Sequence, residues 1–205
     1  MKKFFTKDLF FKCKILLSIR ESIKYRAIIH IFKNTEYQVS KTSNLNIEEK
    51  FGIGRNIDYT GRLKTTFIMQ KNSTLNICGK FYSYTGSKIV IHPDAILTVG
   101  NGSFMNVDSK IYCKEKITIG DNVFIGEEVI IRDTDEHSIK GRINTKPIII
   151  GNHVWIGMRC IILKGVHIGN NVVIGAGSIV TKNIPDNCIA AGNPAKIIRK
   201  NISWN

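Results

Sequence analysis

A strict six-residue period runs through the second half of the chain and constrains the fold more than any other feature. One aliphatic residue opens each repeat between residues 150 and 184, and four of the six are followed directly by glycine. The repeat positions are Ile150, Ile156, Ile162, Ile168, Ile174 and Val180, with Val154, Cys160, Val166, Val172, Ser178 and Ile184 four residues after each. A helix repeats every ~3.6 residues and a strand about every two, so neither fits. The period predicts a parallel β-solenoid, in which each hexad is a short strand with a corner and three hexads make one coil.

Upstream, the same period continues with one long interruption. Two further hexads begin at Ile119 and Ile125 and lead to Ile131. The period lapses over residues 132–147, which predicts a loop that leaves the solenoid, and functional residues concentrate on such loops. Earlier coils, from about residue 51, are more weakly patterned, and small insertions at corners shift their phase. Their expected aliphatic and aromatic positions are Leu63, Phe67, Leu75, Ile77, Val99, Met105, Ile111 and Ile117.

The 205 residues are expected to form one soluble domain in three parts. These are a basic helical segment at 1–50, the solenoid at 51–186 and a short tail at 187–205. Five cysteines are widely spaced and form no CxxC pair, which favours a reducing compartment such as the cytoplasm and argues against a disulfide framework or a zinc site. Cys160 falls on an inward repeat position and is expected to be a packed small hydrophobe.

The N-terminal segment differs in composition from the repeats. Residues 9–33 are apolar and basic and contain neither proline nor glycine, so one or two helices are expected. Charged residues interrupt any signal-peptide core, and no run is long enough to span a membrane. Residues 1–33 hold nine Lys and Arg against Asp8 and Glu21. The segment is interpreted as a cap on the open end of the solenoid, with contact to an anionic membrane surface as the alternative.

The formal net charge of +14 favours an anionic partner. No nucleic-acid-binding motif is visible and aromatic residues are not interleaved with the basic ones, so nucleic acid is not expected. A phosphorylated cofactor, an acidic glycan or a phospholipid surface would each satisfy the charge.

Three segments carry a resemblance to a known family. These are HVWIG at 153–157, IGNNVVIGAGSIVTK at 168–182 and AAGNPAK at 190–196. Together they resemble the hexapeptide-repeat acyltransferases, and in particular the sugar O-acetyltransferases that act on galactosides, maltose, nodulation factors and surface polysaccharides. The match covers about residues 117–199. The resemblance implies a left-handed β-helix, a homotrimer, acetyl-CoA as donor and active sites in clefts between subunits.

Transfer of an acetyl group to a sugar hydroxyl requires a general base, and imidazole has a suitable pKa. His137 lies in the loop that breaks the period, and the resemblance places the family's catalytic histidine in this loop. Asp133, Asp135 and His137 alternate, so an extended chain would direct all three to one side. A carboxylate beside the imidazole would fix its tautomer, with Asp135 preferred as partner and Asp133 as the alternative. His153 and His167 lie in regular hexads, where an outward side chain is expected.

The resemblance also assigns positions on the donor side. Met158 stands where the family has a small polar residue, which leaves only a backbone hydrogen bond there. Trp155 is expected to wall the acyl-CoA arm, although a buried coil position is the alternative. The full set of donor positions is Trp155, Gly157, Met158, Ala176, Gly177, Thr181, Lys182, Lys196 and Arg199. Of these, Lys196 and Arg199 match basic residues that meet the phosphates of CoA.

The acceptor side is less defined. Asn106 matches an asparagine that faces the acceptor in the galactoside enzymes, but a simple corner asparagine is equally compatible. Tyr84 and Tyr112 are further candidates for contacts to a carbohydrate, which is free, polymeric or lipid-linked. Neither metal nor a three-histidine zinc site is expected. Rival functions are N-acetylation of a nucleotide-linked amino sugar, inactivation of a drug, and a non-catalytic scaffold.

Overall fold

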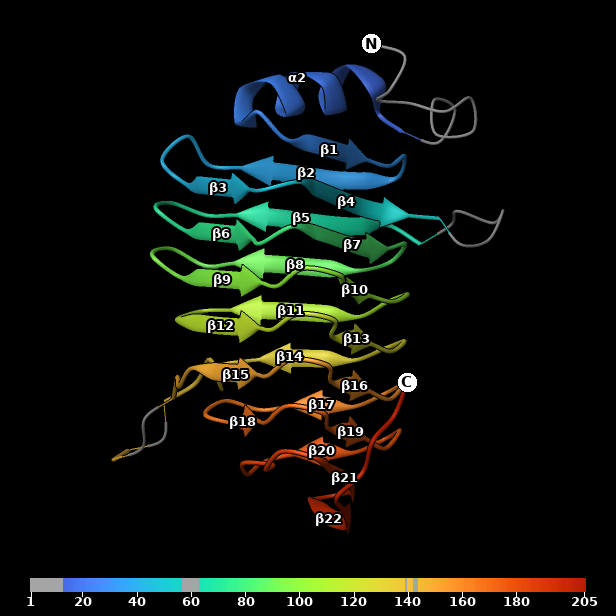
Figure 1. The fold of residues 1–205 in the computed structure, drawn as a ribbon. Coiled ribbons are helices and arrows are strands. Elements are labelled where there is room, and N and C mark those ends of the chain that lie inside the picture. The colour runs from blue at the N-terminus through green and yellow to red at the C-terminus, as the bar shows by residue number, and fades with distance from the viewer. Residues whose placement is uncertain (1–12, 57–62, 139, 142–143) are drawn as a thin grey trace.

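The computed structural model describes residues 13–56, 63–138, 140–141 and 144–205. The chain winds into a stack of coils whose walls are three parallel sheets (Figure 1). The nine-stranded sheet contains β1 (Ile28–Ile31), β4 (Lys50–Arg55), β7 (Lys80–Tyr84), β10 (Ser103–Met105), β13 (Phe124–Ile125), β16 (Trp155–Ile156), β19 (Val173–Ile174), β21 (Cys188–Gly192) and β22 (Ala195–Lys200).

The seven-stranded sheet contains β2 (Thr35–Val39), β5 (Thr65–Met69), β8 (Lys88–Ile91), β11 (Lys110–Cys113), β14 (Ile130–Arg132), β17 (Ile161–Ile162) and β20 (Ile179–Val180). The six-stranded sheet contains β3 (Asn44–Ile47), β6 (Thr74–Ile77), β9 (Ile96–Val99), β12 (Lys116–Ile119), β15 (Ile148–Ile150) and β18 (His167–Ile168). Each full coil visits the nine-, seven- and six-stranded sheets in that order. We call the turns that follow them the first, second and third corners. The predicted β-solenoid is confirmed.

Two coils are long, with Lys50 paired to Lys80 after 30 positions and Phe124 paired to Trp155 after 31, and the other coils shorten along the stack. Ile28 of β1 pairs with Lys50 of β4, 22 positions later, and Phe104 pairs with Phe124, 20 positions later. In the C-terminal part, Trp155 pairs with Val173 after 18 positions, which is three hexads. The strict six-residue period is therefore a property of the last coils alone.

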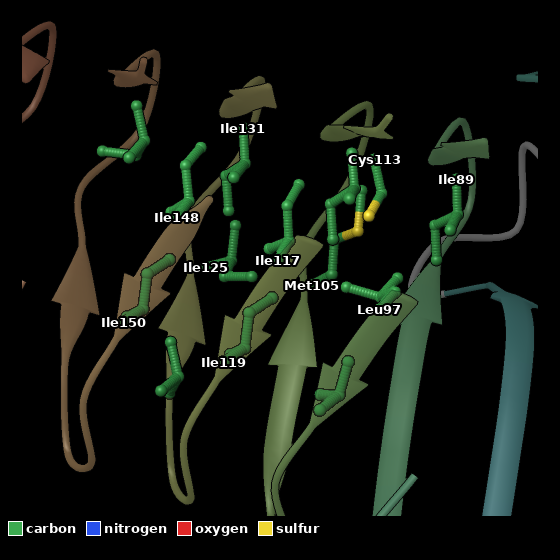
Figure 2. Close-up of a cluster of buried hydrophobic side chains, with 14 of the residues drawn as sticks. Ile89, Leu97, Met105, Cys113, Ile117, Ile119, Ile125, Ile131, Ile148 and Ile150 are labelled. Atoms are coloured by element: carbon green, nitrogen blue, oxygen red, sulfur yellow. The ribbon is translucent and has the colours of Figure 1, made fainter. Parts of the chain in front are cut away.

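One continuous apolar core fills the space between the sheets. Figure 2 shows part of it, with aliphatic side chains from successive coils stacked above one another. All twelve repeat positions between residues 150 and 184 are buried, and so are Phe67, Leu75, Ile77, Val99, Met105, Ile111 and Ile117. Leu63, also expected in the core, is instead exposed. Cys160 is buried as expected, and burial raises the pKa of its thiol.

The N-terminal end differs from the expected boundaries. Helix α2 (Ile15–Tyr25) lies across the first coil, as a cap would (Figure 1). It ends at Tyr25 rather than near residue 33, because Arg26 adopts a left-handed conformation that lets the following amides bond the last carbonyls. Residues 28–31 then pair with β4 as a strand, which suits their β-branched side chains. The solenoid therefore begins at Ile28, well before residue 51.

The other two expected boundaries are closer to the structure. Strand β14 ends at Arg132 and β15 begins at Ile148, so the interval between them coincides with the stretch where the six-residue period lapses. The tail, expected from residue 187, is a hairpin. Its first strand, β21, continues the nine-stranded sheet in parallel, and β22 adds to it antiparallel and so covers the end of the sheet.

Candidate active site

The excursion at the second corner is tied together at its base. Thr134 and Thr145 form an antiparallel bridge. The amide of Asp135 donates to the carbonyl of Asn144 at 2.8 Å, and the amide of Lys146 donates to that of Asp133 at 3.0 Å. The chain therefore leaves the coil as a short two-stranded stem.

Asp133 is fully buried at the root of this stem. Its carboxylate accepts hydrogen bonds from three successive backbone amides of the preceding coil, at 2.7 to 2.9 Å, namely those of Lys114, Glu115 and Lys116. These bonds satisfy a buried charge and anchor the loop to the coil. Asp133 thus acts on the backbone and does not face the side on which the other two loop residues lie.

His137 and Asp135 lie on the exposed part of the loop. Asp135 forms an ion pair with Lys164, which follows β17 one coil later. The chain bends before His137, where Glu136 has a φ of +63° and pairs with Arg132 at 2.9 Å. The alternation of Asp133, Asp135 and His137 therefore does not place them on one side. Within the described part of this chain, no hydrogen bond joins His137 to either aspartate.

A second group of candidate residues stacks in one column at the first corner. The ladder of the nine-stranded sheet aligns Met105, Ile125, Ile156 and Ile174 in successive coils. The residues that follow them are Asn106, Gly126, Gly157 and Gly175, with Met158 and Ala176 one position further. The structure thus brings one acceptor candidate and several donor candidates onto the same corner.

The backbones of this column are packed very closely. A Cβ atom at Gly157 would lie 2.7 Å from the amide nitrogen of Ala176, so no larger residue fits there. The amide of Gly177 donates to the carbonyl of Met158 at 2.8 Å. Around Gly177, by contrast, a Cβ would meet nothing within 4 Å, so backbone there is open to a ligand. The column therefore presents closely packed backbone with few large side chains, against which an extended ligand could lie.

The acceptor candidates are placed differently from one another. The side-chain oxygen of Asn106 accepts a hydrogen bond from the amide of Val107 at 2.8 Å, so part of its polar capacity serves the corner itself. Tyr84 lies near this column, edge-on to Phe104. Tyr112 lies on the seven-stranded sheet, where the charged ends of Lys88 and Arg132 stand 5.5 and 5.7 Å from its ring centroid.

The remaining donor candidates lie elsewhere on the chain. Thr181 and Lys182 follow β20 and are exposed at the second corner, which also bears the His137 loop. Lys196 and Arg199 are exposed on β22, opposite Ala191 and Ile189. In a single chain the candidate base and the stacked column therefore lie at different corners.

An aromatic cluster was not expected from the sequence. The ring of Trp204 stacks on His153 with centroids 3.9 Å apart and planes 4° apart, and it also contacts Trp155 and Phe124. The Nδ1 atom of His153 shares a hydrogen bond with Asn171 at 2.8 Å. His153 thus does not simply point into solvent, whereas Trp155 remains 49% exposed, contrary to the buried alternative. Trp204 lies outside the repeats, so the six-residue period gives no information about its position, and its aromatic side chain was the only available signal.

The described residues form neither a candidate metal site nor a candidate membrane span. Among them, no three His, Cys, Asp or Glu side chains converge as metal ligands would. No helix in the same part of the chain is long and apolar enough to cross a bilayer.

Comparisons with known proteins agree with this architecture. Residues 147–182 match the family model described as the hexapeptide repeat of succinyl-transferase. The polysialic acid O-acetyltransferase of Escherichia coli O1:K1 is 44% identical over 142 residues, covering 66% of this chain but only 43% of that protein. The chain thus spans less than half the length of that relative. The polysialic acid O-acetyltransferase of Neisseria meningitidis is 39% identical over 159 residues, covering 74% of this chain and 70% of that protein.

A solved structure gives the same result for the fold. The crystal structure of a polySia-specific acetyltransferase superposes with a TM-score of 0.56 at 32% identity, covering 84% of this chain and 78% of that one. Sequence identity and coverage at this level go beyond shared architecture. The chain is a left-handed β-helix and belongs to the family of hexapeptide-repeat acetyltransferases.

Proposed function

We propose that this protein transfers the acetyl group of acetyl-CoA to a hydroxyl of a carbohydrate, in a surface polysaccharide of the capsular or O-antigen type or in its precursor. The observation that carries the proposal is the exposed His137, held on an anchored loop of an acetyltransferase scaffold. The names of two relatives, both polysialic acid O-acetyltransferases, support an acceptor of this chemical class.

In the proposed mechanism His137 removes the proton from the sugar hydroxyl as the oxygen attacks the thioester carbon. The new C–O bond forms, the C–S bond then breaks, and the imidazolium returns its proton to the sulfur of the leaving thiolate. Backbone amides of the first-corner column, with Asn106 as a further donor, stabilise the tetrahedral oxyanion. We propose direct transfer, and the burial of Cys160 beneath that column, which raises the pKa of its thiol, supports a mechanism without a cysteine nucleophile.

Asp135 and Asp133 have distinct parts in this proposal. Asp133 positions the loop through its three backbone hydrogen bonds. Asp135 lies two positions before His137 and is paired with Lys164, so it would orient the imidazole only when that pair opens or when a second chain rearranges the loop. We therefore regard Asp135 as a positioning residue.

The arrangement of the candidates supports an oligomer. His137 and the first-corner column lie on different corners of one chain, so a cleft that contains both is built by adjoining the second corner of one copy to the first corner of the next. A contact between the second corner of one copy and the first corner of the next is heterologous, and identical contacts of this type can close into a ring. We propose a ring of three copies. We propose a homotrimer in which Trp155, Met158, Ala176 and Gly177 line the acyl-CoA arm.

Basic residues would serve the phosphates of the donor. Lys182 at the second corner and Lys196 and Arg199 on β22 are exposed and carry donors suited to phosphate oxygens. We place the reaction in the cytoplasm, where acetyl-CoA is available and where the five free cysteines of this chain would stay reduced.

The test is an acceptor panel with matched histidine variants. The wild-type protein, His137→Ala and His167→Ala would be incubated with acetyl-CoA and with oligosaccharides, simple glycosides and nucleotide-linked amino sugars. His167 is an exposed histidine of a regular coil and serves as the control. An alkali-labile ester on an oligosaccharide is expected, with kcat reduced about 100-fold or more in His137→Ala only. Near-normal turnover of that variant would sink the proposed base, and an alkali-stable amide would indicate an amino-sugar N-acetyltransferase.

A complementation experiment tests the shared cleft. Ala176→Trp should obstruct the donor column, and His137→Ala removes the base. Mixed trimers prepared from the two inactive chains are expected to recover part of the activity, because some clefts then combine one intact corner from each chain. No recovery in mixed trimers, with normal assembly by light scattering, would place the whole site within one chain.

A further inference from the structure

Several polar side chains of the helix at the open end of the solenoid face inward. The hydroxyl of Ser18 accepts a hydrogen bond from the amide of Ile31, and that of Ser22 accepts one from the amide of Ile29, both at 2.9 Å. These amides belong to β1, the edge strand of the nine-stranded sheet. An uncovered strand edge needs hydrogen-bond partners, and the two hydroxyls, one helical turn apart, supply them.

The same inner face also buries a carboxylate. Glu21 is almost inaccessible, and it accepts hydrogen bonds from the Tyr37 hydroxyl at 3.0 Å and from Arg20 at 2.8 Å. Ser18, Glu21 and Ser22 thus face the protein, although these residue types usually face water. The inner face of α2 is therefore mixed, because Leu17 and Tyr25 of the same helix pack against the apolar core.

Two large apolar side chains of α2 lie on its outside. Leu16 and Ile23 are 85% and 73% exposed, and no other large hydrophobic residue of the described chain exceeds 66%. They are seven positions apart on one helix and therefore lie on the same face. No described residue covers them, so they are available to a partner surface.

The charges around this face are basic. Arg20, whose guanidinium group also pairs with the buried Glu21, lies between the two hydrophobic residues, and Lys24 and Arg26 are exposed as well. Exposed hydrophobic residues with a basic rim match a surface that is apolar beneath and negatively charged above. That is the profile of a bilayer containing anionic phospholipids.

The position of the helix suits a flat partner. Figure 1 shows α2 lying across the end of the stack, so that its outer side forms the terminal surface of the solenoid. We propose that α2 docks the protein, end-on, to an anionic phospholipid surface through Leu16, Ile23 and their basic rim. This inference is independent of the acetyl-transfer proposal, because the lipid contact uses none of the residues assigned to that site.

The test uses the full chain and lipid vesicles. Binding would be measured by co-sedimentation with vesicles of phosphatidylcholine alone and of phosphatidylcholine mixed with phosphatidylglycerol. The wild-type protein should bind the mixed vesicles and should be released by high salt. Leu16→Gln/Ile23→Gln should weaken that binding about tenfold or more, since two inserted side chains are lost. The control, Leu63→Gln/Ile198→Gln, removes two exposed hydrophobic residues elsewhere and should bind as the wild type does.

Three results would overturn the proposal. One is equal binding by the wild type and Leu16→Gln/Ile23→Gln, or no binding of the wild type to mixed vesicles. Another concerns residues 2–12, whose sequence is rich in Phe and Lys and which lie outside the described residues. If deletion of residues 2–12 abolishes vesicle binding, these residues and not α2 make the contact. The same holds if the wild type does not bind and the deletion variant does. The third is a doubled molecular mass that Leu16→Gln/Ile23→Gln halves, because the occupant would then be a second copy of the chain.

Folding and activity controls separate the remaining explanations. Leu16 and Ile23 are exposed, so the melting temperature of their variant should stay near that of the wild type. Its acetylation of a soluble acceptor should also be unchanged. A variant that loses vesicle binding but keeps both properties isolates docking, and failure of the acetylation assay in every variant would affect only the proposed function.

Discussion

The first and last coils of this solenoid both enclose an apolar core, but they differ in length per turn, in strand length and in the size of their core side chains. Coils near the N-terminus take 22 or 30 residues per turn and have strands of four to six residues, whereas the last coils take 18 and have strands of two. The wide coils bury Phe51, Phe67 and Phe81, and the narrow coils bury only aliphatic and small side chains. Phe51 stacks on Phe81 at 5.9 Å and meets Phe67 edge-on at 5.4 Å, so three aromatic rings fill the larger cross-section.

The difference teaches how circumference and core volume are linked. Longer strands move the three walls apart, and close packing then demands larger side chains between them. Six-residue strand-and-corner units fix the smaller triangle, which Ile and Val fill. Small side chains in the wide coils and aromatic side chains in the narrow coils should therefore each lower the free energy of unfolding, and core substitutions measure this directly.

The largest effect is expected from Phe51→Ala. The substitution removes the ring that contacts both neighbouring phenylalanines and leaves a cavity in the widest part of the core, which should lower the free energy of unfolding by about 3–5 kcal/mol. Phe104→Ala, on the half-buried outer side of the same sheet, is the matched control and should cost clearly less. Urea denaturation measures both. Equal losses would mean that the wide coils are not held by their interior rings.

The reverse exchange should also destabilise the protein. Ile162→Phe places an aromatic ring in an 18-residue coil whose interior has no room for it, at a cost of about 1–3 kcal/mol or more from overpacking. Ile161→Phe is the control, because Ile161 is the adjacent residue on the outer side of the same strand. Calorimetry of the two variants gives the comparison, and a stabilised Ile162→Phe would contradict the size limit.

The same contrast explains which parts of the fold the sequence could reveal. A strict hexad repeats every six residues only where every coil has 18, so the coils from Ile150 onward were predictable and the first was missed. The sequence predicts helix for residues 28–31, which form a strand, because a 22-residue coil carries no six-residue period. Leu63 was assigned to the core on the strength of its residue type, yet it is exposed.

The candidate site divides in the same way. The loop was predictable because it interrupts the period, and the glycine corners because they repeat. The role of Asp133 was not, since its partners lie 17 to 19 positions earlier, one coil away, and alternation within a segment carries no information about them. Trp204 was missed because a tail outside the repeats has no register with the residues it covers.

The two ends of the solenoid provide a further comparison. Ser18→Ala removes the buried hydroxyl that serves the edge strand at the wide end, which leaves the amide of Ile31 without that partner. The cost should be about 1–3 kcal/mol, as for other buried donors left unsatisfied. Ser40→Ala, an exposed hydroxyl on a turn, is the control. Thermal unfolding of both variants measures the difference, and equal melting temperatures would show that α2 does not close the edge through this contact.

At the narrow end, Trp204→Ala should have a smaller effect, about 1–2 kcal/mol. The ring loses its stacking on His153 and its contact with Trp155, while the coil beneath stays intact. Because the chain has two tryptophans, the variant also isolates the fluorescence of Trp155, which should then report acetyl-CoA binding. An unchanged melting temperature would mean that the tail does not brace the last coils.

The smallest expected effect concerns pH and again separates the wide coils from the narrow ones. Burial lowers the pKa of His92, at the second corner beside Lys114, below its usual value of 6.5. The unfolded chain therefore binds a proton at His92 more readily than the folded protein does, so stability is retained above about pH 6.5 and declines as the pH falls from there towards the folded-state pKa. His92→Gln should flatten the dependence of melting temperature on pH between about 5 and 7. His167→Gln, an exposed histidine of a narrow coil, should leave the wild-type slope in place. A slope that persists in His92→Gln but disappears in His167→Gln would assign the acid sensitivity to the C-terminal coils.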